Sequence, residues 1–101
     1  MSYAVLRDAI INKKQVSCTY RNLAREICPH VIGRGKDGRA MVLSFQFGGQ
    51  SSTRLPPGGE WRCMQVDDIT NATSHAGQWH TGDNHSRPQT CVKDIDVEVD
   101  H

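Results

Sequence analysis

The feature that most constrains the fold is a series of short segments in which apolar and polar residues alternate. In residues 40–47, Met41, Leu43 and Phe45 fall on one face of an extended chain, because successive side chains of a β-strand point to opposite faces. Further segments of strand character lie at residues 16–21, 25–32, 60–69 and, more weakly, 70–79. Turn residues separate these segments, so we expect short antiparallel strands joined by hairpins.

One amphipathic helix is expected before the strands. Residues 2–15 carry an apolar stripe at helical spacing, and Ser2 is a suitable N-cap. A helix followed by five or six strands predicts a mainly β fold, namely a small SH3- or Sm-like antiparallel β-barrel with an N-terminal α-helix. We expect a single domain over residues 1–101, with the helix at 1–15, the barrel at 16–80, and a coil with an acidic edge strand or tail at 81–101.

Composition and cysteine usage bound the location of the protein. The apolar runs are much shorter than the roughly 20 residues that a membrane span needs, and the first residues lack a secretory leader pattern. We therefore expect no membrane association and a cytoplasmic location. The four cysteines, Cys18, Cys28, Cys63 and Cys91, are widely spaced, which predicts buried free thiols in a cytosolic chain. If the protein were secreted, three ways of pairing them in two disulfides would be possible.

Charge is unevenly distributed along the chain. Residues 1–62 contain ten Lys/Arg and four Asp/Glu, a net charge of +6, whereas residues 63–101 contain two and seven, a net charge of −5. A basic first part favours an anionic partner. The acidic residues 94–100 would compete with that partner for the basic surface by folding over it. The alternative is that the two parts neutralise each other within the fold.

Residues 33–38 contain a motif whose context does not support a functional interpretation. Residues 33–38 match the dinucleotide fingerprint G-x-G-x-x-G, but Asp37-Gly38 is a hairpin signal and the next segment is a strand rather than a helix. Pro29 interrupts residues 25–32, which places it at a sheet edge or a β-bulge. The polar residues 48–59 form a long loop, typical of a functional or mobile segment.

No catalytic or metal-binding constellation emerges from the titratable residues. His75, His80 and His85 recur at intervals of five, which does not align ligands on one face of a strand or helix. Asp67 and Asp68 would point to opposite faces of a strand and cannot share a proton. We therefore expect a protein that is not an enzyme and binds neither a metal nor a cofactor.

The order of motifs resembles that of a known family. A short helix precedes a strand ending in Tyr20-Arg21, then Arg25-x-x-x-Pro29-His30, a Gly-Arg-led apolar strand, and finally Trp61-Arg62-x-Met64-x-Val66-Asp67-x-Ile69. Over roughly residues 3–70 this is similar to the WYL domain, an Sm-like or SH3-like barrel usually found behind a DNA-binding helix-turn-helix in bacterial transcription regulators. The tripeptide that names the family is replaced by Ala40-Met41-Val42, and no helix-turn-helix precedes the barrel.

The resemblance implies binding of a nucleic acid or a nucleotide-like ligand on a basic barrel face. Arginine pairs bidentately with phosphate, and tyrosine or histidine can stack on a base. The predicted ligand-binding residues are Tyr20, Arg25, His30, Arg34, Arg39 and Arg62. The expected partner is therefore a single-stranded nucleic acid or a nucleotide-like anion. The alternative is a protein–protein adaptor that docks a partner through an edge strand and the loop at residues 48–59.

Overall fold

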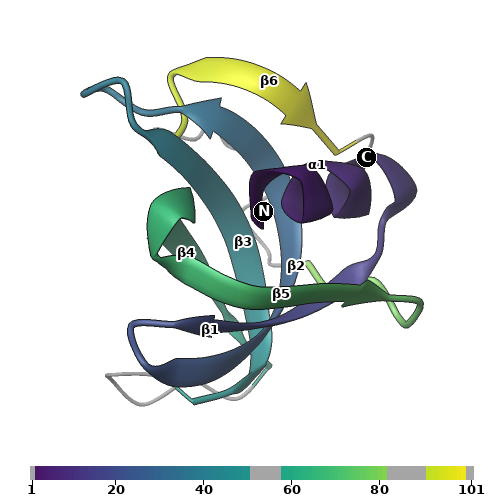
Figure 1. The fold of residues 1–101 in the computed structure, drawn as a ribbon. Helices are drawn as coiled ribbons and strands as arrows, with labels where there is room; N and C mark the ends of the chain where they lie inside the picture. Colours follow the sequence, from purple (N-terminus) through teal and green to yellow (C-terminus); the bar gives the residue numbers. More distant parts are fainter. Residues whose placement is uncertain (1, 51–57, 82–90, 100–101) are drawn as a thin grey trace.

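The protein is a six-stranded antiparallel sheet preceded by a helix in the part of the chain that the computed structural model describes, residues 2–50, 58–81 and 91–99 (Figure 1). In chain order the elements are α1 (Ser2–Asn12), β1 (Gln15–Tyr20), β2 (Leu23–Arg34), β3 (Ala40–Gly49), β4 (Glu60–Gln65), the 3-10 turn η1 (Val66–Asp68), β5 (Ile69–His75) and β6 (Asp94–Glu98). The strand order is β4-β3-β2-β1-β5, and β6 pairs with β2. The expected mainly β class with an N-terminal helix is confirmed.

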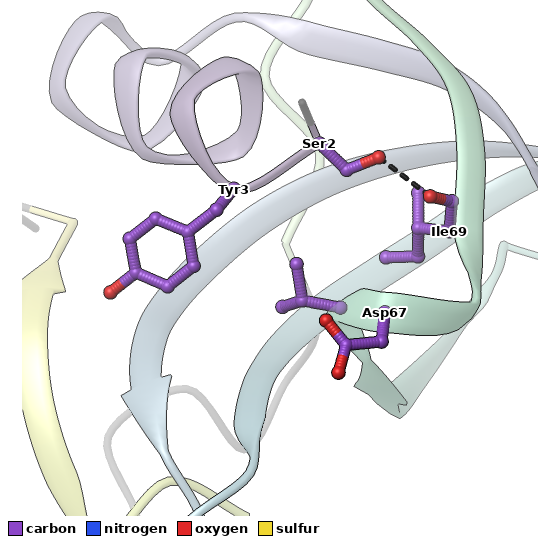
Figure 2. Close-up of a pocket in the computed structure, with 5 residues that line it drawn as sticks. Ser2, Tyr3, Asp67 and Ile69 are labelled. Atoms are coloured by element: carbon purple, nitrogen blue, oxygen red, sulfur yellow. Dashed lines mark hydrogen bonds between the residues drawn. The ribbon is translucent and has the colours of Figure 1, made fainter.

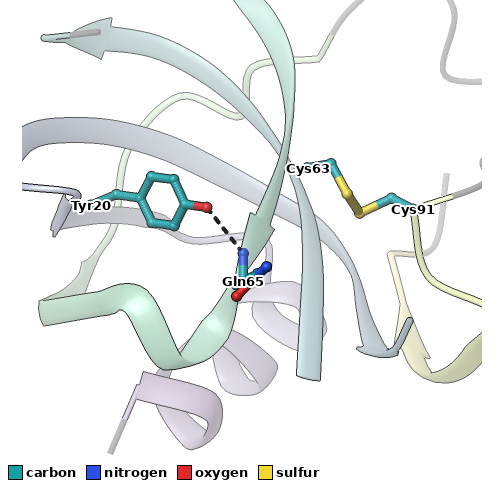
Figure 3. Close-up of a disulfide and its surroundings, with 4 residues drawn as sticks. All are labelled: Tyr20, Cys63, Gln65 and Cys91. Atoms are coloured by element: carbon teal, nitrogen blue, oxygen red, sulfur yellow. Dashed lines mark hydrogen bonds between the residues drawn. A yellow bond between two sulfur atoms is a disulfide. The ribbon is translucent and has the colours of Figure 1, made fainter. Parts of the chain in front are cut away.

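The sheet does not close into the expected barrel. Its two edges are β4 and β5, which do not pair with each other. The predicted strand at residues 60–69 ends instead at Gln65, and η1 carries the chain from one edge to the other. The backbone N–H of Gln65, the last residue of β4, donates to the hydroxyl of Tyr20 on β1 at 3.3 Å (Figure 3). Helical φ/ψ at η1 interrupts strand geometry, so the closing ladder cannot form.

Strand β2 changes partner along one of its edges, and Pro29 lies at the change. Leu23–Ile27 pairs with β1, whereas Val31–Arg34 pairs with β6. On the other edge the register with β3 shifts between Pro29 and Val31. Proline has no N–H to donate to a ladder, and the predicted bulge is thus confirmed within a strand that is central to the sheet.

The helix α1 packs its apolar stripe into the concave side of the curled sheet, beside β6 and away from the β1–β2 turn (Figure 1). Leu6, Ala9 and Ile10 are buried there. Burying such side chains stabilises the fold by about 1.5–3 kcal/mol each. Ser2 does not cap the helix as expected, because its hydroxyl donates to the Ile69 carbonyl at 2.6 Å instead. No helix in the described ranges is long and apolar enough to cross a membrane.

The acidic segment near residue 94 is a strand, β6, as the alternating sequence favoured. Asp96 accepts hydrogen bonds from Tyr3 Oη at 2.7 Å and from Arg7 Nε at 3.1 Å, which fastens β6 to α1. These two contacts lower the pKa of Asp96, the hydrogen bond from Tyr3 having the larger effect. The acidic residues therefore lie at the helix side of the sheet.

A disulfide joins Cys63 on β4 to Cys91, just before β6 (Figure 3). The expectation of four free thiols is wrong for this pair, whose Cα atoms lie 5.8 Å apart. Cys18 and Cys28 are buried and free, as expected. Twenty-eight residues of sequence separate the bonded cysteines, so only the fold brings them together.

Candidate anion-binding site

Five side chains from four strands meet on the concave face, at the end of the sheet away from α1. We call them the arginine cluster: Tyr20 on β1, Arg25 on β2, Ser44 and Gln46 on β3, and Arg62 on β4. Cross-strand pairing explains why these side chains share a face. Ser44 lies opposite Arg62, and Arg25 lies opposite Cys18, so each pair points to the same side of the sheet. Tyr20 belongs to the hydrophobic core, so the cluster forms the polar end of that core.

Arg25 is the centre of the cluster. Its Nη1 donates to Gln46 Oε1 at 3.1 Å, and its guanidinium carbon lies 5.4 Å from the centre of the Tyr20 ring. Gln46 is itself held in place, since its Nε2 donates to the carbonyls of Gly48 and Gln50 at 3.0 and 2.9 Å. The guanidinium therefore has a fixed position between an amide and an aromatic face.

The charge of Arg25 is buried without a carboxylate partner in the described part of the chain. The residue is 4% exposed. Burial lowers its pKa, and the nearby charge of Arg62 lowers it further. Arginine remains protonated even so, and a buried cation without a counter-ion is costly. The protein thus keeps a positive charge on this face that its own described side chains do not neutralise.

Two polar atoms beside that charge lack a protein hydrogen-bond partner among the described residues. They are Arg25 Nε and the hydroxyl of Ser44, which is fully buried. Buried polar atoms are nearly always hydrogen-bonded in folded proteins. A donor and a hydroxyl left over at a cationic position are the groups that an incoming oxyanion would use.

Arg62 is the accessible member of the cluster. Its side chain is 22% exposed and forms an ion pair with Glu60 at 3.0 Å. Arg21 adds a further cation at the rim, with its guanidinium 5.2 Å from the Tyr20 ring centre. Arg21 and Arg25 both lie over the Tyr20 ring, and the charge of Arg62 acts on Arg25, which favours an anionic ligand.

His30, a predicted ligand-binding residue, lies on the opposite, convex face. Its ring is 4.7 Å from those of both Trp61 and Trp79, and its Nδ1 lies 2.7 Å from the Cys28 carbonyl oxygen. The residue is 1% exposed. We call this group the aromatic cluster: His30, Phe45, Phe47, Trp61, Trp79 and His80. His30 and Phe45 are buried, and the other four members are half-buried.

Arg34 and Arg39 occupy a third place, the turn between β2 and β3. Arg34 Nη1 donates to the Gly38 carbonyl at 2.9 Å, and Arg39 Nε lies 3.6 Å from Asp37 Oδ2. This turn is at the opposite end of β2 from Arg25 (Figure 1). Both side chains have local partners at the turn and contribute nothing to the arginine cluster.

The six predicted residues are therefore divided among three places. Tyr20, Arg25 and Arg62 come together, whereas His30 and the two turn arginines do not join them. Ser44 and Gln46 were not among the predicted residues, although each has polar character within an otherwise apolar strand. That isolated polarity at inward-facing positions was the available signal, because alternation places both on the face shared with Met64 and Val42.

The acidic strand β6 does not cover the arginine cluster. Asp94 lies opposite Arg34 in the β2–β6 register, at the far end of β2 from Arg25. The idea that residues 94–100 fold over the basic surface is therefore wrong for the part described, Asp94–Glu98. No group of three metal-binding side chains is present within the described ranges, and His85 lies outside them.

Comparison with protein-family models, with curated proteins and with solved structures found no match for this chain.

Proposed function

We propose that the protein is a non-enzymatic binding module that recognises a nucleic acid or a nucleotide-like anion through the arginine cluster. The observation that carries the proposal is Arg25: a cation 4% exposed, without a carboxylate partner in the described chain, beside a second arginine. A phosphate entering from the Arg62 side would supply the missing negative charge and accept from Arg25 Nε and Ser44 Oγ. Tyr20 would then lie close to the attached group.

The sequence resemblance to the WYL domain supports the same interpretation. Tyr20, Arg25 and Arg62 are among the positions carried over from that family, and here they converge on one face. The strand order β5-β1-β2-β3-β4 with a preceding helix is compatible with an Sm-like barrel that is open along one seam. A regulatory function, in which the ligand state is passed to another protein, follows from the resemblance alone.

The test compares Arg62→Ala with Arg39→Ala, which removes an equal charge from the distant turn. Labelled single-stranded DNA and RNA, and inorganic phosphate as the smallest probe, are titrated at low and moderate salt. We expect Arg62→Ala to weaken oligonucleotide binding roughly tenfold and to reduce the salt slope by about one, while Arg39→Ala changes affinity little. Absence of binding at low salt, or equal losses in both variants, would overturn the proposal.

A second candidate is the protein–protein adaptor. The outer edge of β4 pairs with no strand in the described chain, and such an edge can accept a partner strand. Residues 51–57 of the predicted docking loop lie outside the described residues. A salt-tolerant interaction that is lost when residues 48–59 are shortened, and kept in Arg62→Ala, would favour this candidate.

The compartment in which the module works also follows from a covalent feature. The sequence favours the cytoplasm, but disulfides persist mainly in oxidising compartments. We therefore propose that the Cys63–Cys91 form works outside the reducing cytosol. Thiol titration of protein isolated with an alkylating agent present should give two free thiols, and four would support the cytoplasmic location.

A further inference from the structure

A pocket lies between the start of α1 and the turn η1. It has a volume of about 280 Å³ and is lined by Ser2, Tyr3, Val66, Asp67 and Ile69. Figure 2 shows Ser2 and Tyr3 descending from the helix on one side, with Asp67 and Ile69 facing them from η1 and β5. The volume is at the lower end of small-ligand sites and suits a short chain rather than a nucleotide.

Two hydrogen bonds hold the walls of the pocket. Ser2 Oγ donates to the Ile69 carbonyl at 2.6 Å, which joins the helix to β5. Tyr3 Oη donates to Asp96 at 2.7 Å, and this hydrogen bond restricts the orientation of the ring. Burial and this hydrogen bond raise the pKa of Tyr3, which keeps its hydroxyl a donor. The pocket is therefore formed before any ligand arrives.

The chemistry of the lining is apolar, aromatic and anionic. Val66 and Ile69 are 4% and 3% exposed and form an apolar floor. Asp67 is exposed and has no hydrogen bond or ion pair within the described chain. Arg7 and Arg34 are the cations whose charge reaches Tyr3, and Asp96 offsets Arg7 at 3.1 Å. Asp67 thus contributes a negative charge to the same lining as the Tyr3 ring.

We propose that this pocket binds a primary alkylammonium group. The methylenes would pack on Val66 and Ile69, and the ammonium would pair with Asp67 beside the Tyr3 ring, a combination of ion pair and cation–π contact. The site is distinct from the arginine cluster and takes the opposite charge. A free amine and a lysine side chain share this chemistry.

The test is a titration of the whole protein with n-butylammonium chloride, followed by amide NMR spectra. n-Butanol serves as the neutral control, and Asp67→Asn is compared with Asp68→Asn, which alters the adjacent carboxylate outside the lining. We expect saturable shifts at Ser2, Tyr3 and Ile69, weakened roughly fivefold or more in Asp67→Asn and unchanged in Asp68→Asn. Equal shifts with n-butanol, equal losses in both variants, or no saturation would overturn the proposal.

A second arm of the titration separates the two sources of the amine. N-acetyl-lysine N-methylamide carries the same alkylammonium group on a peptide backbone. Tighter binding of this probe than of n-butylammonium identifies a lysine side chain as the ligand, whereas weaker binding identifies a free amine. Anion binding at the arginine cluster should be unaffected by Asp67→Asn, so the two proposals fail independently.

Discussion

The arginine cluster and the aromatic cluster occupy opposite faces of the same strands, and some of their members are neighbours in the sequence. Phe45 precedes Gln46, and Trp61 precedes Arg62, so alternation sends one member of each pair to each face. On the convex face the rings of the aromatic cluster pack on each other at 4.1–5.3 Å. On the concave face Arg25 Nε and Ser44 Oγ have no partner in the described chain. The two faces therefore differ in that ring packing dominates one, while buried polar groups gather on the other.

The disulfide tests the convex face with the largest expected effect. Replacing both Cys63 and Cys91 by serine should lower the free energy of unfolding by about 3–4 kcal/mol in urea denaturation, because the bridge restricts the unfolded chain. Anion affinity should not change, since Cys63 points away from Arg62. Wild-type protein with a reductant is the control. A parallel loss of affinity would mean that the two faces are coupled.

A substitution within the aromatic cluster should have the next largest effect. Trp61→Ala removes ring contacts to His30 at 4.7 Å and to Phe45 at 5.3 Å, and should cost about 2–4 kcal/mol of unfolding free energy. Trp61→Phe retains an aromatic ring and should recover most of that loss. Thermal and urea unfolding of the two variants provide the measurement. Equal stability of both would show that ring packing at position 61 contributes nothing measurable to the free energy of unfolding.

The concave face should give the opposite result. Arg25→Met removes a buried charge while keeping most of the side-chain volume, so the free energy of unfolding should stay constant or rise by about 1 kcal/mol. Anion affinity should fall roughly tenfold, because the charge and the Nε donor are lost. Arg34→Met, at the distant turn, should change neither quantity. A large destabilisation in Arg25→Met would instead make Arg25 a structural residue.

The two free cysteines lie one on each face, and Cys18 makes the smallest predicted effect measurable. Burial raises the pKa of Cys18 to about 11 from an ordinary value of 9.0. The unfolded thiol ionises first, so stability should fall as pH rises between these values, by up to about 1.4 kcal/mol per pH unit. Urea unfolding below and above pH 9 should show this slope, and Cys18→Ala should reduce it. An unchanged slope would assign the alkaline loss to other groups, Cys28 among them.

Much of the fold was available from the sequence because a period of two indicates strands, although it did not indicate which face is buried, since the polar Ser44 and Gln46 are fully buried in β3. Residues 40–47 and 94–98 alternate, and both are strands. Pro29 lacks an N–H, and it lies at a bulge. The open seam was not available, because Asp67-Asp68 is compatible with the end of a strand but does not indicate that a 3-10 turn at Val66–Asp68 separates two sheet edges.

The candidate site was only partly accessible from sequence. Arginine on a strand is visible in the sequence, but its face depends on register and bulges that depend on the whole sheet. Arg25 on β2 and Arg62 on β4 flank β3, and both point to the same face of the sheet. His30 lies five residues from Arg25 along β2, beyond a bulge, and points to the other face. The Cys63–Cys91 pairing follows from the same three-dimensional arrangement and has no sequence signature.

The hydrogen bond from the Gln65 N–H to the Tyr20 hydroxyl has a kinetic consequence. Gln65 is the last residue of β4, and its N–H donates to a side-chain hydroxyl. Opening of this contact leaves every strand pair intact, so the Gln65 amide hydrogen should exchange with solvent through a local motion. The exchange rate of this amide hydrogen measures how often the interior beside Tyr20 opens to water.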